Sequence, residues 1–261
     1  FQEFHTKGLG IINVILFEKT QYSYLWSMNP PSFKKPLINV IDEDYLIPHL
    51  NRRRRVAALL PHNYATSNKT YPVLYLHDGQ NLFDDHAPFG NWGVDKQLAV
   101  LADLGIEVIV IAIDHGGKER IAEYLPYDNP KFTEKKGEQY LQFMMEDLKP
   151  HIDKNFRVKT GREHTGIGGS SMGGLISLYA GFNFNEVFGN LMIFSPSIWI
   201  SEQVFKQATH FNPFGSTKIY LYSGGQESHS LKPSMDFLGS ILKSREKMTG
   251  QIEIMESYNP E

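Results

Sequence analysis

A glycine-rich turn around Ser171 restricts the possible folds of this chain more than any other segment. Glycines stand two residues before and two residues after Ser171, and a second serine, Ser170, precedes it. A short strand-like run, 164–168, leads into the turn, and apolar residues at helical spacing follow it over 175–180. A strand–turn–helix of this kind is so tight that only small residues fit, and it holds the central serine in a strained backbone conformation with its hydroxyl exposed. We therefore expect Ser171 to be a nucleophile; a glycine-rich turn that only caps a helix is the alternative.

Strands and helices alternate along the chain from residue 72 onward. Short runs rich in β-branched residues predict strands, and longer runs with apolar residues at helical spacing predict helices. The continuous apolar run 107–113 is typical of a strand buried on both faces of a parallel sheet. Together with the turn at Ser171, this alternation predicts the α/β-hydrolase fold, a doubly wound, mostly parallel central sheet flanked by helices. The predicted strands are 52–60, 72–77, 107–113, 164–168, 190–194, 218–222 and 251–255, and the predicted helices are 94–104, 134–156, 175–181 and 231–247.

The amino-terminal part of the chain is less regular. Residues 1–41 predict an N-terminal extension or edge strands, including a strand-like run at 10–17, and residues 42–261 predict the hydrolase domain. Four consecutive arginines begin the predicted strand 52–60. Such a row can form a polyanion site, but we expect a strand whose basic residues lie on a solvated face or at an edge of the sheet.

Composition argues against several classes of function. The formal net charge is −3, which gives no electrostatic case for binding nucleic acid or an anionic membrane. The chain has no cysteine, so thiol catalysis, disulfides and cysteine-ligated metals are excluded. No run approaches the ~18 apolar residues that span a bilayer. We therefore expect neither nucleic acid nor membrane as a partner, while the oligomeric state stays open, as does the choice between a cytoplasmic and a periplasmic or secreted location.

The loop 77–81 is predicted to supply half of an oxyanion hole. It follows a strand that should lie beside the strand leading to the nucleophile, and a glycine within it permits a sharp turn. We expect the backbone N–H groups of Gln80 and Met172 to stabilise the negative charge that develops on the attacked carbonyl oxygen. The side chains of His77 and Asp78 could suggest a metal or acid–base site. They have no clustered partners in the sequence, so we expect structural hydrogen bonds instead.

The acid and the base of a serine triad are expected on later loops. Glu227 follows the predicted strand 218–222 after two glycines, and it could hold a histidine in the productive tautomer. A solvated loop glutamate is the alternative, and Asp114 precedes the nucleophile, which is the wrong chain order. No histidine follows His229, which lies too close to Glu227 in sequence to be a good base. We expect the catalytic histidine after Glu261, where the loop following the last strand should begin; a degenerate hydrolase is the alternative.

Short motifs stand in a fixed order from about residue 42 to the end of the chain. Each is loose by itself, but together and at this spacing they are specific. They are Arg54-Arg55-Val56, Leu60-Pro61, Val73-Leu-Tyr-Leu-His-Asp-Gly-Gln-Asn-Leu-Phe83, Trp92, Ile111-Ala-Ile-Asp114, Arg120, Glu123-Tyr124, Pro126, Gly169-Ser-Ser-Met-Gly-Gly174, Phe194-Ser-Pro-Ser-Ile-Trp199 and Gly224-Gly225-Gln226-Glu227.

With these motifs the sequence resembles the putative esterase family of α/β-hydrolases, which includes enterochelin esterases, esterase D, feruloyl and acetylxylan esterases and mycolyltransferases. The resemblance leaves out residues 1–41. It implies a serine ester hydrolase that forms an acyl-enzyme and needs neither a metal nor an organic cofactor. It also implies Ser171 as the nucleophile and Glu227 as the acid, with the family's histidine in a segment that would begin after Glu261.

Aromatic residues on the predicted loops indicate where a substrate would bind. We expect Trp199, Asn81 and Tyr124 to contact it, although a tryptophan after a strand is as often a core residue. The expected partner is a small-molecule or carbohydrate-linked carboxylic ester, with carbohydrate, phenolic and siderophore esters all open. Two other functions stay open as well. One is a non-catalytic α/β-hydrolase domain that binds a carbohydrate or a protein partner, and the other is an acyltransferase that uses an alcohol in place of water.

Overall fold

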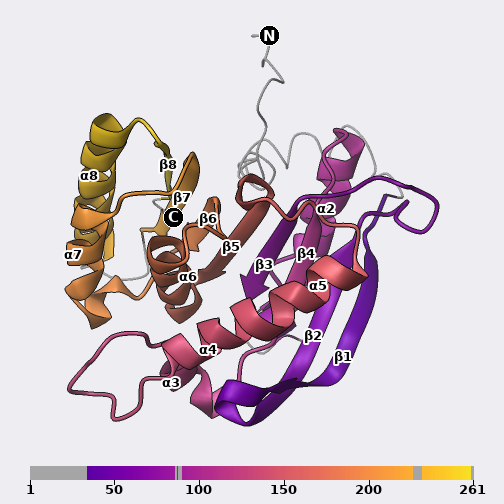
Figure 1. Cartoon of the computed structure of the whole chain (residues 1–261), viewed down its shortest axis with the longest axis horizontal. Helices are drawn as coiled ribbons and strands as arrows, with labels where there is room; N and C mark the ends of the chain where they lie inside the picture. Colours follow the sequence, from indigo (N-terminus) through magenta and orange to yellow (C-terminus); the bar gives the residue numbers. More distant parts are fainter. Residues whose placement is uncertain (1–33, 86, 88–89, 226–230, 260–261) are drawn as a thin grey trace.

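The computed structural model describes residues 34–85, 87, 90–225 and 231–259. The predicted strand at 10–17, Glu227 and His229 lie outside these residues. Within them the chain forms an eight-stranded sheet with helices on both faces, which confirms the predicted α/β-hydrolase architecture (Figure 1).

The sheet has the strand order β1-β2-β4-β3-β5-β6-β7-β8. Six neighbouring strands, β4, β3, β5, β6, β7 and β8, run parallel to one another. The strand β2 pairs antiparallel with both of its neighbours, β1 and β4. Because the carboxyl ends of the parallel strands all lie at the same end of the sheet, the loops that follow the strands gather there. The strands are β1 (Leu37–Ile47), β2 (Arg52–Leu60), β3 (Val73–His77), β4 (Ile109–Ile113), β5 (Thr165–Ser170), β6 (Asn190–Phe194), β7 (Thr217–Gly224) and β8 (Ile252–Asn259).

The four predicted helical segments are present to within a few residues, whereas α3 and α7 were not predicted. One π-helical turn, Met144–Leu148, joins α4 to α5, so the predicted helix at 134–156 is one continuous helical segment with a local widening. The helices are α2 (Val94–Asp103), α3 (Arg120–Glu123), α4 (Gly137–Phe143), α5 (Lys149–Asn155), α6 (Met172–Asn183), α7 (Gln203–His210) and α8 (Leu231–Thr249).

Two buried apolar clusters lie on opposite faces of the sheet. Side chains alternate between the faces along each strand, so Tyr75 packs in one cluster and its neighbour Leu74 in the other. The Tyr75 side is covered by α4 to α8, and the Leu74 side is covered by α2 through Leu98 and Leu101. In Figure 1 the chain from α4 to α6 crosses in front of the sheet and α2 lies behind it. The turn at Ser171 therefore sits on a sheet that is covered on both faces.

Two strands extend beyond the predicted limits. The edge strand β1 begins at Leu37 and continues across the predicted boundary between residues 41 and 42. At the other end β8 continues to Asn259, beyond the predicted end at residue 255. Both extensions come from backbone pairing with a neighbouring strand, which local composition does not reveal.

The arginine row is only partly solvated. The strand β2 lies between β1 and β4 and is therefore not an edge of the sheet. Arg52 and Arg53 are exposed, but Arg54 is buried, so the predicted solvated face is wrong for Arg54. Its guanidinium donates a hydrogen bond of 2.9 Å to the buried carboxylate of Glu123, which makes burial of the charge possible.

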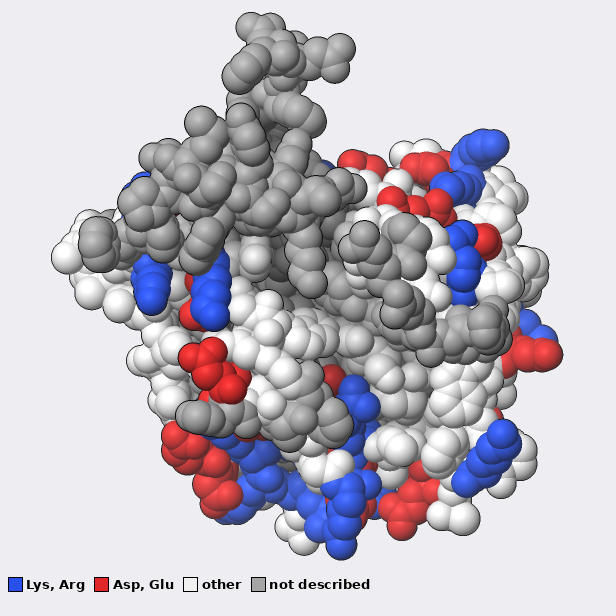
Figure 2. Space-filling model, turned by 180° about the vertical axis from the view of Figure 1, so that it is seen from behind, with Lys and Arg blue, Asp and Glu red and all other residues white. Residues whose placement is uncertain are grey.

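The surface of the described residues carries charges of both signs. Figure 2 shows Lys and Arg interspersed with Asp and Glu on the face opposite to that of Figure 1. No helix in the part of the chain that the structure describes is long and apolar enough to cross a bilayer.

Candidate active site

Ser171 lies at a sharp turn between β5 and α6. Its φ of 57° and ψ of −118° place it in a region that side chains rarely adopt, as expected for a serine held in a strained elbow. The glycines around it are required by space. A Cβ built on Gly169 would lie 2.9 Å from the backbone carbonyl carbon of Gly173, closer than real Cβ atoms approach. The predicted strand–turn–helix at Ser171 is therefore present, and small residues are needed to close it.

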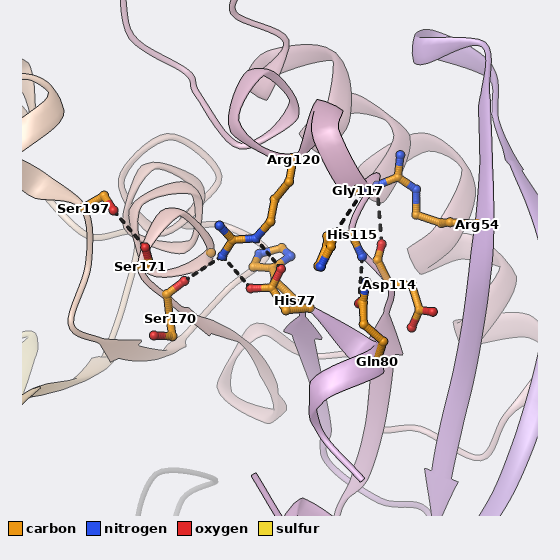
Figure 3. Close-up of polar contacts among 12 residues, drawn as sticks. Arg54, His77, Gln80, Asp114, His115, Gly117, Arg120, Ser170, Ser171 and Ser197 are labelled. Carbon is orange, nitrogen blue, oxygen red and sulfur yellow. Dashed lines mark hydrogen bonds and ion pairs between the residues drawn. The ribbon is translucent and has the colours of Figure 1, made fainter. Parts of the chain in front are cut away.

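The last residue of β6 and the loop that follows it hold Ser171 through three contacts. The N–H of Ser171 donates to the carbonyl oxygen of Phe194 at 3.0 Å, and the N–H of Ser197 donates to the carbonyl oxygen of Ser171 at 2.9 Å. The hydroxyl oxygens of Ser171 and Ser197 lie 3.0 Å apart, as drawn in Figure 3. Ser197 stands within the Phe194–Trp199 motif, but no local feature of the sequence marks it as a partner of Ser171. Its contact with Ser171 depends on β6 lying beside β5.

The predicted oxyanion loop lies beside the elbow. The strand β3 pairs in parallel with β5, and Leu76 stands opposite Gly168, so the loop after β3 reaches the start of α6. A Cβ on Gly173 would lie 3.2 Å from the side chains of both His77 and Asp78, which shows how closely the loop approaches the first turn of α6. As the first residue of that helix, Met172 has an N–H without an intrahelical carbonyl partner.

Gln80 is fixed by its own side chain. It lies in a short 3-10 helix, Gly79–Asn81, and its Oε1 accepts a hydrogen bond of 3.0 Å from the N–H of His115. This contact ties the loop after β3 to the loop after β4, as Figure 3 shows. The arrangement leaves Gln80 and Met172 on two neighbouring strand ends, where the sequence analysis expected the two oxyanion donors.

His77 and Asp78 make structural hydrogen bonds, as the sequence predicted. The carboxylate of Asp78 accepts two hydrogen bonds from Arg120, of 2.6 and 2.8 Å. His77 is fully buried, and its Nδ1 lies 3.0 Å from the hydroxyl of Tyr140. Burial lowers the pKa of His77 to about 4, so the imidazole is neutral at physiological pH. Among the described residues no group of three or more His, Cys, Asp or Glu side chains is arranged to hold a metal ion.

A second buried ion pair holds α3, the short helix that begins with Arg120. Arg54 and Glu123 are 3% and 1% exposed, so their charges are fully desolvated. Burial lowers the pKa of Arg54, but the hydrogen bond and the charge of Glu123 outweigh it and the pKa is raised. Asp114, the second choice for the triad acid, lies 3.3 Å from Arg55 in another ion pair. The charges behind the oxyanion loop are thus arranged in pairs that join β2 to the segment 114–123.

The three predicted substrate contacts differ in position. Trp199 lies in a short 3-10 helix, Ile198–Ile200, and is 61% exposed. Tyr124 is fully buried, with its ring centroid 5.1 Å from that of His77 and 5.2 Å from that of Tyr140. It is therefore a core residue behind the oxyanion loop, which corrects its predicted contact with substrate. Asn81 is 6% exposed, and it too offers almost no surface to a ligand.

The residues predicted to complete a triad are not brought together within the described part of the chain. Ser171 is hydrogen bonded to Ser197 there, and no described histidine bonds to its hydroxyl. Glu227 lies outside the described residues, as noted above. The structure thus supplies a strained turn at Ser171 that lies beside the loop after β3.

Known proteins are similar to this chain in sequence and in fold. A family model described as "Putative esterase" matches residues 47–253. The uncharacterized protein YbbA of Bacillus subtilis is 26% identical over 191 residues, which are 70% of this chain and 72% of that protein. Esterase Rv1288 of Mycobacterium tuberculosis is 32% identical over 123 residues, 47% of this chain and 25% of that protein.

The structural likeness extends over most of the chain. The enterobactin esterase FES from Shigella flexneri, solved in the presence of enterobactin, gives a TM-score of 0.67 at 19% identity. The match covers 87% of this chain and 56% of that one. The chain thus spans about a quarter of esterase Rv1288 and about half of the enterobactin esterase. At 19% identity the likeness to FES shows a shared fold alone.

Proposed function

The chain belongs to the putative esterase family, and on this premise we propose that it hydrolyses carboxylic esters through an acyl-enzyme on Ser171. The observation that carries the proposal is the strained position of Ser171 between β5 and α6, with φ at 57°. A residue held at such an angle by its surroundings is a recognised sign of a functional site. Here the turn presents the Ser171 hydroxyl at the carboxyl ends of the parallel strands, where the loops that follow them gather.

The reaction proceeds in two steps. The Ser171 oxygen attacks the ester carbonyl while a base takes its proton, and the N–H groups of Gln80 and Met172 stabilise the tetrahedral oxyanion. The alcohol then leaves with the proton from the base, and the acyl group stays on the serine. Water attacks the acyl-enzyme in the same way, which releases the carboxylic acid and restores the Ser171 hydroxyl.

In this proposal the base is a histidine that Glu227 orients. The strand β8 runs parallel to β7, so the carboxyl ends of both strands lie at the same end of the sheet as Ser171. In the sequence, Glu227 stands three residues after the last residue of β7. A histidine between these two strand ends would complete the chain order of serine, acid and histidine that this fold uses.

Trp199 supports a ring-containing substrate. Its indole is exposed and lies two residues beyond Ser197, whose hydroxyl contacts the nucleophile. An exposed indole offers a flat apolar face for an aromatic or a sugar ring. We therefore favour esters of phenolic, catechol-containing or carbohydrate compounds over simple aliphatic esters.

Covalent labelling of Ser171 tests the function. The folded chain is incubated with a fluorophosphonate probe, and mass spectrometry locates the adduct, while p-nitrophenyl acetate reports ester turnover. An adduct on Ser171 that is lost in Ser171→Ala supports the proposal. A folded chain with neither adduct nor turnover would contradict it. That outcome would favour a non-catalytic binding domain, an alternative motivated by the absence of a histidine bonded to Ser171 among the described residues.

A further inference from the structure

One arginine links the two loops that carry the candidate oxyanion donors. Arg120 begins α3 and belongs to neither loop. Its Nε and Nη2 donate to the two carboxylate oxygens of Asp78 at 2.6 and 2.8 Å, and Nη2 also reaches the carbonyl oxygen of Ser170 at 3.3 Å. Figure 3 shows its guanidinium between Ser170 and the loop after β3. A single side chain therefore connects the residue before the nucleophile to the loop that contains Gln80.

The link is strong because its charges are largely withdrawn from water. The Asp78 side chain is 4% exposed and the Arg120 side chain 21%. Burial lowers the pKa of Arg120, but the hydrogen bond and charge of Asp78 outweigh it, so the guanidinium stays charged. A bidentate arginine–carboxylate pair fixes both distance and orientation. The other side of the guanidinium is supported by the ring of the buried Tyr124, whose centroid lies 5.3 Å away.

Asp78 also needs to be held. Its φ of 59° lies in the left-handed region, which is unfavourable for a residue with a side chain. This conformation turns the chain from β3 into the 3-10 helix that contains Gln80. Because the Asp78 carboxylate lies against the first turn of α6, next to Gly173, the position of Asp78 also sets the position of the loop relative to Met172.

We propose that Arg120 is a positioning residue, which acts through Asp78 and Ser170 to hold the N–H groups of Gln80 and Met172 toward one oxyanion. This inference rests on the proposed function. Since the bridge needs two parallel hydrogen bonds, a lysine cannot replace it, because its ammonium group is a point charge without the planar fork. Small displacements of catalytic groups reduce rates by up to about 100-fold.

The test compares two arginines that are similarly connected. Arg162 donates to Asn185, Ser216 and Thr217 at the opposite end of the sheet, so Arg162→Gln is the matched control. We expect Arg120→Gln and Arg120→Lys each to lower kcat for p-nitrophenyl acetate by about 10- to 100-fold, with KM changed by less than about threefold. Arg162→Gln should keep kcat at an equal folded fraction. Full kcat in Arg120→Lys, or equal losses in both glutamine variants, would overturn the proposal.

Hydrogen–deuterium exchange supplies a readout that does not depend on turnover. In Arg120→Gln the amides of residues 78–82 should exchange faster, whereas in Arg162→Gln they should exchange at the wild-type rate. Unchanged exchange at 78–82 in Arg120→Gln would contradict the link itself. If the wild-type chain forms no fluorophosphonate adduct, the proposed function fails, and the exchange result still decides whether Arg120 holds the loop.

Discussion

The hydroxyl oxygen of Ser171 lies 3.0 Å from that of Ser197, although the two residues come from loops after different strands. The same two residues are joined through their backbones, because the N–H of Ser197 donates to the carbonyl oxygen of Ser171. Replacing the Ser197 side chain therefore removes one contact to the nucleophile and leaves the backbone contact in place. This separation makes it possible to ask which hydroxyl performs the chemistry.

Ser171→Ala should lower ester turnover by roughly 10⁴- to 10⁶-fold, because the proposed acyl-enzyme forms on the Ser171 hydroxyl. Ser197→Ala should change kcat by less than about 10-fold, because a neutral hydrogen bond contributes only about 1 kcal/mol. Steady-state hydrolysis of p-nitrophenyl acetate by the two variants measures both. A larger loss of turnover in Ser197→Ala than in Ser171→Ala would show that Ser197, and not Ser171, is the nucleophile. Ser170→Ala provides a neighbouring control.

Gly169→Ala should destabilise the protein by about 1–3 kcal/mol, because the new methyl group would meet backbone that cannot move aside. Urea unfolding followed by circular dichroism measures the change. Gly215→Ala is the control, since its Cβ would lie no closer than 3.2 Å to another atom, and that atom belongs to the Arg162 side chain rather than to backbone. Equal stability in both variants would show that the elbow tolerates a larger residue at position 169.

Arg54→Met should destabilise the protein by about 3–5 kcal/mol, because Glu123 would keep a buried charge without its partner. The double variant Arg54→Met with Glu123→Leu should recover much of that loss, since both charges are then removed. Free energies of unfolding for the two single variants and the double variant form a thermodynamic cycle. Additive losses in the double variant would contradict a direct coupling between the two side chains.

The stability of the protein should fall as the pH drops from about 6.5 to about 4, in part because of His77. Its pKa of about 4 in the folded protein lies below the ordinary 6.5, so the unfolded chain takes up a proton that the folded protein does not. The contribution of His77 to the free energy of unfolding is fully present above pH 6.5. About 3 kcal/mol is lost once the pH has fallen below about 4. His77→Gln should show a smaller loss than the wild type between pH 7.5 and 4.5 in urea unfolding. Identical losses would mean that His77 does not titrate in this way.

Trp199→Ala should raise KM for esters of aromatic acids several-fold and leave stability almost unchanged, because the indole is 61% exposed. KM for p-nitrophenyl acetate should change less, since its acetyl group has no ring for the indole. Phe214→Ala, at a residue 75% exposed in another loop, is the matched control and should leave both KM values unaltered. If KM for aromatic and acetyl esters rose equally, Trp199 would not select for a ring.

Local sequence was sufficient to predict most of the fold and the tight turn at Ser171. The turn could be predicted because it accepts only small residues, and small residues dominate the consecutive positions 168–174. The strands were predicted from short apolar runs, either alternating or continuous. The longest helical segment was predicted from apolar residues at helical spacing. The order of the parallel strands also placed the loop after β3 beside the elbow, as predicted.

The tertiary structure decided the contacts that connect these elements. Arg120 meets Asp78 and Ser170 across 42 and 50 positions of sequence, and Arg54 meets Glu123 across 69. The burial of Tyr124, which had been predicted to contact substrate, came from the same packing. The sequence by itself determined where the backbone must turn and which side chains are small, since those are local steric demands. Which charges pair and which rings are buried depended on strand order and packing, because such contacts form only once distant segments share one low-dielectric interior.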